Sequence, residues 1–294
     1  MANFDFDQAE GLRRMLAGPK PRIVTFLSAT DAEDRGAMLV NLSASLAHAG
    51  NDVILLDACC SASGVAARLG VAPGATLIDV ARQQCGLNQV VRAVPQGFNV
   101  VALAHSPLRA AWQPQDEARR LAKTFDVLVK QTSIVVVDGQ LDQDQAFPVP
   151  AMANNEIVIQ VSNSANSIKA AYSLIKRISL ELGRRPFGIL VTGASESEAK
   201  LVYDNMAQAA SRYLALQLNS MGSVPADEFV HRAARLGRAV IDAFPLAGAS
   251  VAYRRLAGRL SRANGAVIPS TGSGLGSASQ KRAQLATHGN HVGI

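Results

Sequence analysis

Short apolar runs recur along the chain, and each is continuous rather than alternating between apolar and polar residues. They cover residues 22–28, 52–57, 98–103, 133–138, 156–161 and 187–192. Helical periodicity covers residues 36–49, 115–130, 165–182, 196–215, 226–236 and 249–262. Strands that are covered on both faces are apolar throughout, and strands that alternate with helices pair in parallel. The pattern therefore predicts an α/β fold, with a doubly wound, mostly parallel sheet and helices on both faces.

The carboxyl ends of the strands are where a ligand of such a sheet binds. The segments that follow these ends are 28–36, 57–64, 138–146 and 192–196. We therefore expect any functional site of the main domain to draw on these four segments.

The chain divides into three parts by composition. Residues 4–17 have a helical pattern that ends at Gly18-Pro19-Lys20-Pro21, so residues 1–21 are predicted to be a detached helix and linker. Residues 22–262 carry the apolar runs and form one large domain. Residues 263–294 are rich in Gly, Ser, Ala and Gln, which predicts a disordered tail.

The lack of a recognisable targeting signal and the number of cysteines indicate a cytoplasmic protein. No run of about 18 apolar residues is present, and the acidic N-terminus has no signal-peptide core. The three cysteines are an odd number in a long chain, which is typical of reduced thiols. Cys59 and Cys60 have no second cysteine or histidine pair at ligand spacing, so we predict no metal site.

Positive charge is concentrated in the C-terminal part of a chain whose net charge is +6. Asp242 is the one acid after Phe229, against nine basic residues: Arg232, Arg235, Arg238, Arg254, Arg255, Arg259, Arg262, Lys281 and Arg282. This asymmetry indicates either a polyanionic partner or solubilising surface charge. Specific nucleic-acid recognition is not expected, because no helix-turn-helix or basic patch interleaved with aromatic residues is evident.

The predicted helix over 249–262 is basic and amphipathic, which suits an anionic membrane surface. The residues that would contact lipid are Arg254, Arg255, Leu256, Arg259 and Leu260. The alternative is a surface helix that packs on the sheet. The absence of Trp and Phe from this helix favours the alternative.

Several blocks within residues 5–262 match one protein family. Asp7, Gln8, Ala9, Leu12 and Arg13 fit an N-terminal motif Asp-Gln-Ala-x-x-Leu-Arg. Three further blocks match at AYSLIKRI (171–178), VNLSASLA (40–47) and residues 221–260. In these blocks the chain resembles the FlhG/FleN branch of the MinD/ParA ATPases, which implies a P-loop NTPase fold of the MinD/ParA kind.

The segment that matches the family's phosphate loop departs most from the family's sequence. The family sequence is Lys-Gly-Gly-x-Gly-Lys-Ser/Thr, and the matching residues are Thr30, Asp31, Ala32, Glu33, Asp34, Arg35 and Gly36. Glycines let backbone N–H groups approach phosphate, lysine supplies charge, and the hydroxyl holds Mg²⁺. None of these residues is in place, and three acids lie where the triphosphate would bind. We therefore expect no cofactor, with ATP and Mg²⁺ only if this degenerate loop still binds.

The remaining nucleotide positions also depart from the family. A second aspartate that orients water is replaced by Cys59 in Asp57-Ala58-Cys59, and an asparagine near adenine is replaced by Thr192. Asp138 matches an aspartate that the family has at this position. The alternative interpretation is a structural acid that caps the loop after a strand.

The resemblance implies a regulator of flagellar number or placement that acts on an FlhF-like GTPase of the signal-recognition type. Gln8 would orient the attacking water, Asp7 would fix the helix, and Leu12 and Arg13 would hold the contact face. A flagellar transcription activator and flagellar switch components are further implied partners, with a location in the cytoplasm, at the inner membrane or at the cell pole. The alternatives are an ATP-binding switch with an unorthodox loop, and a regulator that binds a transcription factor or DNA.

Overall fold

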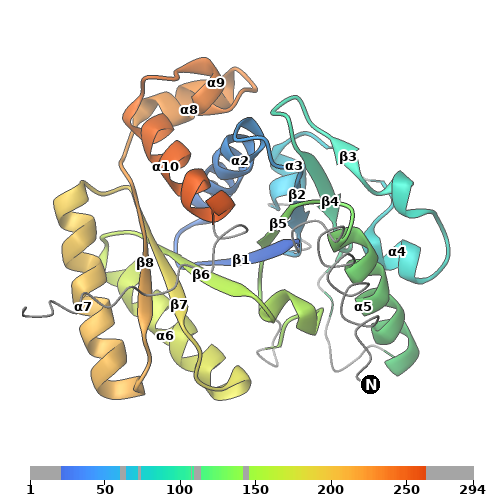
Figure 1. Cartoon of the computed structure of the whole chain (residues 1–294), viewed down its shortest axis with the longest axis horizontal. Helices are drawn as coiled ribbons and strands as arrows, with labels where there is room; N and C mark the ends of the chain where they lie inside the picture. The colour runs from blue at the N-terminus through green and yellow to red at the C-terminus, as the bar shows by residue number, and fades with distance from the viewer. Residues whose placement is uncertain are drawn as a thin grey trace, which may run out of the picture.

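A computed structural model gives the fold of the chain (Figure 1) and describes residues 21–59, 64–71, 74–106, 108, 114–141 and 146–262. The helix predicted over residues 4–17, with Asp7, Gln8, Ala9, Leu12 and Arg13, lies outside the described residues. The tail predicted over residues 263–294 also lies outside them.

Within the described residues, eight strands form one sheet in the order β3-β4-β2-β5-β1-β6-β7-β8. The strands are β1 (Arg22–Ser28), β2 (Val53–Asp57), β3 (Arg92–Ala93), β4 (Asn99–Ala102), β5 (Ile134–Asp138), β6 (Glu156–Val161), β7 (Phe187–Thr192) and β8 (Leu218–Val224). All neighbours pair in parallel except β3 and β4, which are antiparallel. The predicted mostly parallel sheet is confirmed.

Helices cover both faces of this sheet, as Figure 1 shows. One face packs against α4 (Leu77–Ala81), α5 (Gln115–Val129), α6 (Ala165–Leu182), α7 (Glu196–Leu214) and the 3₁₀ helix η3 (Pro150–Ala153). The other packs against α2 (Ala32–His48), α3 (Val65–Arg68), α8 (Glu228–Arg235), α9 (Val240–Ala243) and α10 (Gly248–Arg262). A further 3₁₀ turn, η1 (Leu87–Gln89), precedes β3.

Strand β5 shows why the apolar runs are continuous. Val135 and Val137 belong to one core cluster and Val136 to the other, and all three are fully buried. Successive side chains of a strand point to opposite faces, so a strand with a helical layer on each side needs apolar residues at every position.

Helix α2 begins at Ala32, four residues before the predicted start at Gly36. Asp31 adopts extended backbone angles and its side chain accepts the N–H of Asp34, which makes it the N-cap. Aspartate is among the best N-cap residues. The segment that was interpreted as a degenerate loop is therefore mostly the first turns of a helix.

Helix α10 packs against the domain, which fits the favoured interpretation of the segment 249–262 as a surface helix. Leu256 is 3% exposed and Leu260 is fully buried, and both belong to the core cluster shared with α2. Arg254 donates to the carbonyl of Pro245, and Arg259 to that of Met221, while Arg255 is exposed. With its apolar face inside the core, α10 is a surface helix. None of the helices in the described residues is both long enough and apolar enough to span a bilayer.

Candidate functional site

The site lies where β1, β2 and β5 end and α2 begins. The strand register places Asp138 beside Phe26 on one side and beside Asp57 on the other. The predicted segments 28–36, 57–64 and 138–146 therefore meet at one edge of the sheet, as their described residues show.

The N-terminus of α2 is capped by the chain itself. Asp31 Oδ1 accepts the N–H of Asp34 at 2.8 Å, and the carbonyl of Asp31 accepts the N–H of Arg35 at 3.1 Å. Glu33 and Asp34 add two more acids to the first turn. The pKa of Asp34 is raised, first by burial and then by the charge of Asp31. The end of the helix that would attract an anion therefore carries negative charge of its own.

Arg35 turns inward to a buried carboxylate. Its Nε lies 3.2 Å from Oδ1 of Asp138, whose side chain is completely buried. The thiol of Cys59 lies beside the same carboxylate and also acts to lower its pKa. Burial raises the pKa of Asp138 to about 6, Arg35 opposes this rise, and the charge of Asp57 adds to it. Arg35, which the resemblance aligns with the phosphate-loop lysine, is thus paired with an acid of this chain.

Asp57 has a structural role on the next strand. Its carboxylate accepts the N–H of Cys59 at 3.2 Å and that of Ala66 at 3.0 Å. A Cβ at Gly64 would overlap this carboxylate, so glycine permits the close approach. Asp57 therefore holds the start of α3 against the end of β2.

Cys59 is buried and protonated. Its Sγ donates to the carbonyl of Asp138 at 3.6 Å, and burial, followed by the charge of Asp138, raises the pKa of the thiol. Ligand atoms of Asp57, Cys59 and Asp138 lie within 4.8 Å of one another. A metal ion at this cluster would have to displace Arg35 from Asp138, because the two positive charges repel each other.

Gly36, which the resemblance aligns with a Mg²⁺-binding hydroxyl, lies against the side chain of Arg68. A Cβ at Gly36 would lie 2.5 Å from Nε of Arg68, an exposed residue at the end of α3. The side chain of Arg68 therefore occupies the space beside α2 that a serine or threonine would need.

Thr192 is tied into a buried network at the ends of β1, β6 and β7. Gln160, which is fully buried, donates to Oγ1 of Thr192 at 3.2 Å and to the carbonyl of Asp34 at 3.4 Å. The hydroxyl of Ser28 donates to Oε1 of Gln160 at 3.2 Å. A cavity of about 380 Å³ adjoins Thr192, and three acids line it: Asp34, Asp227 and Glu228.

These residues do not fit magnesium triphosphate. The helix N-terminus is bonded to Asp31, Arg35 is paired with Asp138, and no hydroxyl stands at Gly36. A polyphosphate would have to break the ion pair and approach three acids, which costs several kcal/mol or more.

The sequence identified most residues of this edge but missed two. Thr30 through Gly36, Asp57, Cys59, Asp138 and Thr192 were predicted to gather here, and they do. Gln160 and Arg68 were missed. A glutamine inside the apolar run EIVIQV was a usable signal for Gln160, whereas Arg68 had none, because its place depends on how α3 packs.

Comparisons with known proteins agree with this architecture. No model of a known protein family matches the chain. It is 30% identical to the antiactivator FleN of Pseudomonas aeruginosa over 219 residues, which are 74% of this chain and 78% of that protein. The cell-division protein MinD of Aquifex aeolicus has a TM-score of 0.62 at 17% identity, and 84% of this chain and 98% of that one are covered. MinD of Pyrococcus horikoshii, solved with Mg-ADP, also has a TM-score of 0.62, at 15% identity, and 84% of this chain and all of that one are covered.

Proposed function

Since the chain belongs to the FleN antiactivator family and has the fold of the MinD and ParA ATPases, we propose that it is a non-catalytic regulator of flagellar number or placement. In this proposal the α/β domain is a scaffold that does not use ATP. The segment with Asp7, Gln8 and Arg13 acts on an FlhF-like GTPase.

The loss of ATP use is supported by one observation above all. Two positive groups that would meet the triphosphate are engaged internally: the amide of Asp34 in the first turn of α2 by Asp31, and the guanidinium of Arg35 by Asp138. A nucleotide would have to replace two internal interactions, one of them with a fully buried carboxylate.

Calorimetry with Mg-ATP tests this half of the proposal. At a protein concentration of about 50 μM, affinities of roughly 1–100 μM give measurable heat. We expect no saturable heat. Saturable binding would contradict the proposal and favour the alternative of an ATP-binding switch with an unorthodox loop.

The action on a GTPase is supported by the N-terminal motif. A positioned glutamine amide can orient the water that attacks the γ-phosphate. We expect the full chain to accelerate GTP hydrolysis by an FlhF-like GTPase, and we expect Gln8→Ala to abolish the acceleration. Arg14→Ala, just beyond the motif, is the matched control and should keep it. An unmodified chain that leaves hydrolysis unchanged would refute this half alone.

A second target is supported by the relative's description as an antiactivator. We propose that the chain also binds a flagellar transcription activator, and that flagellar switch components are further partners. Purified activator should bind the chain at moderate ionic strength. Binding to DNA of arbitrary sequence, falling steeply with salt, would instead favour the alternative of a DNA-binding regulator.

A further inference from the structure

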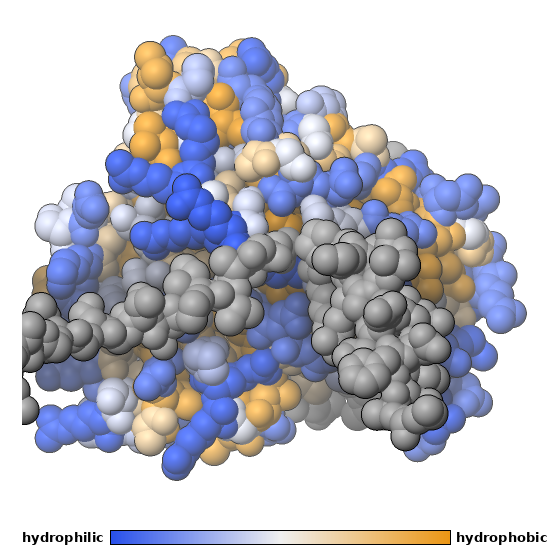
Figure 2. All heavy atoms as spheres, viewed as in Figure 1, coloured by the Kyte–Doolittle hydropathy of each residue, from blue (hydrophilic) through white to orange (hydrophobic). Residues whose placement is uncertain are grey.

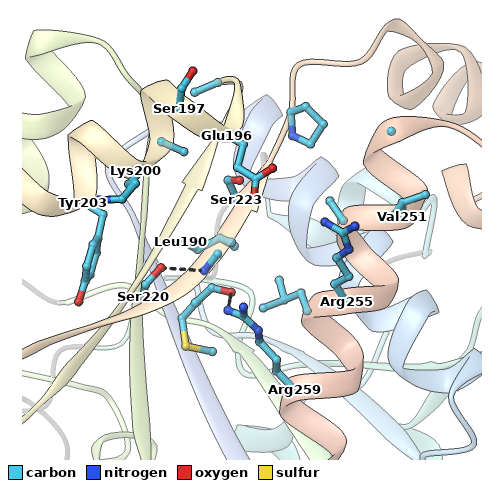
Figure 3. A pocket seen from close by; sticks show the side chains of 18 residues that line it. Leu190, Glu196, Ser197, Lys200, Tyr203, Ser220, Ser223, Val251, Arg255 and Arg259 are labelled. Carbon is cyan, nitrogen blue, oxygen red and sulfur yellow. Dashed lines mark hydrogen bonds between the residues drawn. The ribbon is translucent and has the colours of Figure 1, made fainter.

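Two hollows lie beside β8, and they differ in how far their polar groups are already engaged. The larger, of about 900 Å³, is a groove between α7 and α10 (Figure 3), and hydrophilic side chains gather over α10 on the face shown in Figure 2. Its accessible floor consists of Ser220, Gly222 and Ser223. Lys200 pairs with an acid of its own helix, and Arg259 donates to a backbone carbonyl of β8. The groove therefore offers a ligand little that the chain does not already use.

The smaller hollow is the cavity of about 380 Å³ that adjoins Thr192. Segments far apart in the sequence enclose it: the first turns of α2, the segment from β8 into α8, and Tyr253 of α10. Ala37, Pro225 and Val230 line it and are each partly exposed, so a ligand can reach an apolar wall. Sites for small molecules begin at about 300 Å³, and a cavity of this size takes a short alkyl stem with one polar head.

Tyr253 brings a buried polar group to this cavity. It is 3% exposed and lines the cavity, and its hydroxyl forms no hydrogen bond with a described residue. Burial, followed by the charge of Asp34, raises the pKa of Tyr253, so the hydroxyl end of the ring lies toward that acid. Buried hydroxyls in proteins are hydrogen-bonded as a rule. An unpartnered one at the wall of a cavity indicates a polar group that the cavity receives.

The charged groups of the cavity are mostly acids, and two of them have no cation beside them. Asp34 and Glu228 are exposed, and neither side chain forms an ion pair or a hydrogen bond with a described residue. Asp227 is engaged, because its carboxylate accepts two backbone N–H groups at 3.0 Å. His231, the basic residue of the described lining, lies 3.8 Å from Glu33, which is outside the lining. Unpaired negative charge therefore adjoins the unpartnered hydroxyl.

We propose that this cavity binds an organic cation, an ammonium or guanidinium group on a short alkyl stem. The head lies between the carboxylates of Asp34 and Glu228 and the hydroxyl of Tyr253, which accepts one of its N–H groups. The stem lies along Pro225 and Val230. The same chemistry is supplied by a free amine of the cell and by a lysine or arginine side chain of a partner protein.

A nucleobase suits the cavity less well. Thr192 stands where the resemblance places a residue near adenine, but adenine is uncharged at neutral pH and leaves both carboxylates without a partner. The proposal goes beyond the proposed function and is measured without nucleotide. Saturable binding of Mg-ATP would therefore contradict the proposed function, whereas the proposal fails or holds on its own probes.

Two probes separate the sources, and calorimetry on the full chain at low ionic strength measures both. Agmatine, which has a guanidinium and an ammonium group on an alkyl stem, represents a free amine. A short peptide with a central arginine represents a partner's side chain, and the same peptide with citrulline is its control, because citrulline keeps the shape and loses the charge. We expect saturable binding of agmatine or of the arginine peptide and none of the citrulline peptide.

Three variants locate the binding. Asp34→Asn keeps the N–H that Asp31 caps and removes the charge, so it should weaken binding about tenfold or more. Tyr253→Phe keeps the ring, should weaken binding about threefold or more, and should leave the Tm unchanged, since the hydroxyl has no internal partner. Glu196→Gln is the charge-matched control and should change binding by less than about twofold, because this exposed acid lines the groove of Figure 3 and not the cavity.

Four results would overturn the proposal. The first is the absence of saturable binding by either cation. Equal weakening by Glu196→Gln would reduce the binding to diffuse attraction. Binding of adenosine without binding of either cation would assign the cavity to a nucleobase. A lowered Tm of Tyr253→Phe would show that the hydroxyl serves the fold instead of a ligand. Binding of agmatine supports a free amine as the source, and binding of the arginine peptide alone supports a partner's side chain.

Discussion

Arg35 and Asp138 are the residues at which this chain differs most in physical terms from a nucleotide-binding site. A fully buried carboxylate is costly unless a positive charge stands beside it. Arg35 supplies that charge and is not free to serve a phosphate. This ion pair partly offsets the burial of the acid, and it supports the proposal that no phosphate binds here.

Asp138→Asn should remove a pH dependence of stability. The pKa of Asp138 is about 6 in the folded chain, against an ordinary value of 3.8 that applies to the unfolded chain. Between these two pH values the folded chain therefore binds a proton at Asp138 that the unfolded chain does not. The contribution of Asp138 to the free energy of unfolding is therefore fully present below about pH 4 and is lost as pH rises through 6. Between pH 4.5 and 7 we expect the free energy of unfolding of the unmodified chain to fall by about 2 kcal/mol relative to that of the variant. Urea unfolding at pH 4.5 and 7 measures it.

Glu117 and Glu198 have lowered pKa values, so their contributions to stability change with pH in the opposite sense. Both proteins contain these two residues, and comparing the proteins at each pH therefore cancels their contributions. Parallel pH profiles for the variant and the unmodified chain would show that Asp138 does not titrate in this window.

The residues of the nucleotide edge could be predicted from the sequence, but their partners could not. Asp57, Asp138 and Thr192 each end an apolar run, and parallel strands bring such ends together. Nothing in the sequence indicates that Arg35 turns to Asp138 or that Arg68 lies on Gly36. Those contacts depend on side-chain direction and on the packing of α3.

At the scale of elements, α2 owes its early start to a cap. Asp31→Ala should lower the free energy of unfolding by about 1 kcal/mol, because the N–H of Asp34 loses its acceptor. Glu33→Ala, an exposed position in the same turn, is the matched control and should change it by less than about 0.5 kcal/mol. Urea unfolding checks both, and equal effects would argue against the cap.

Helix α10 gives the second prediction at this scale. Leu260→Ala should destabilise the chain by roughly 2–5 kcal/mol, because Leu260 is fully buried. Val251→Ala, on the exposed side of the same helix, should cost far less. Neither change should alter sedimentation with anionic vesicles, because the folded α10 keeps its apolar face in the core. Vesicle binding that falls with Leu260→Ala while the protein stays folded would restore the membrane interpretation.

The elements that the sequence predicted are those with a strong apolar pattern. Strands β1, β6 and β7 and helix α6 have the predicted bounds. Strand β8 was missed because it is an edge strand whose sequence LNSMGSV is partly exposed and interrupted by glycine. The groove beside it could not be foreseen, since α7 and α10 are distant in the sequence and only the fold brings them to the same strand.

For the whole molecule, the fold is that of the MinD and ParA ATPases, and in the proposed function the site that would couple this fold to ATP is closed. In a switch, a ligand shifts the population only by its differential affinity for two states. If ATP has no site, the chain stays in one state, and its control must come from its amount or from its partners.

Thermal unfolding with and without Mg-ATP tests this at the same scale. A ligand at about 100 times its Kd stabilises a protein by roughly 2.7 kcal/mol, which for a domain of this size raises the Tm by roughly 5–10 °C. We expect no rise with the unmodified chain and none with Arg35→Lys, because the glycines and the hydroxyl are still missing. A further variant restores the whole family loop with six substitutions: Thr30→Lys, Asp31→Gly, Ala32→Gly, Asp34→Gly, Arg35→Lys and Gly36→Thr. Its Tm without ligand should be lower, because the cap and the ion pair are lost. Mg-ATP should then raise the Tm of this variant. A rise with the unmodified chain would mean that phosphate can displace Asp31 and Asp138, and the domain would then be a working switch.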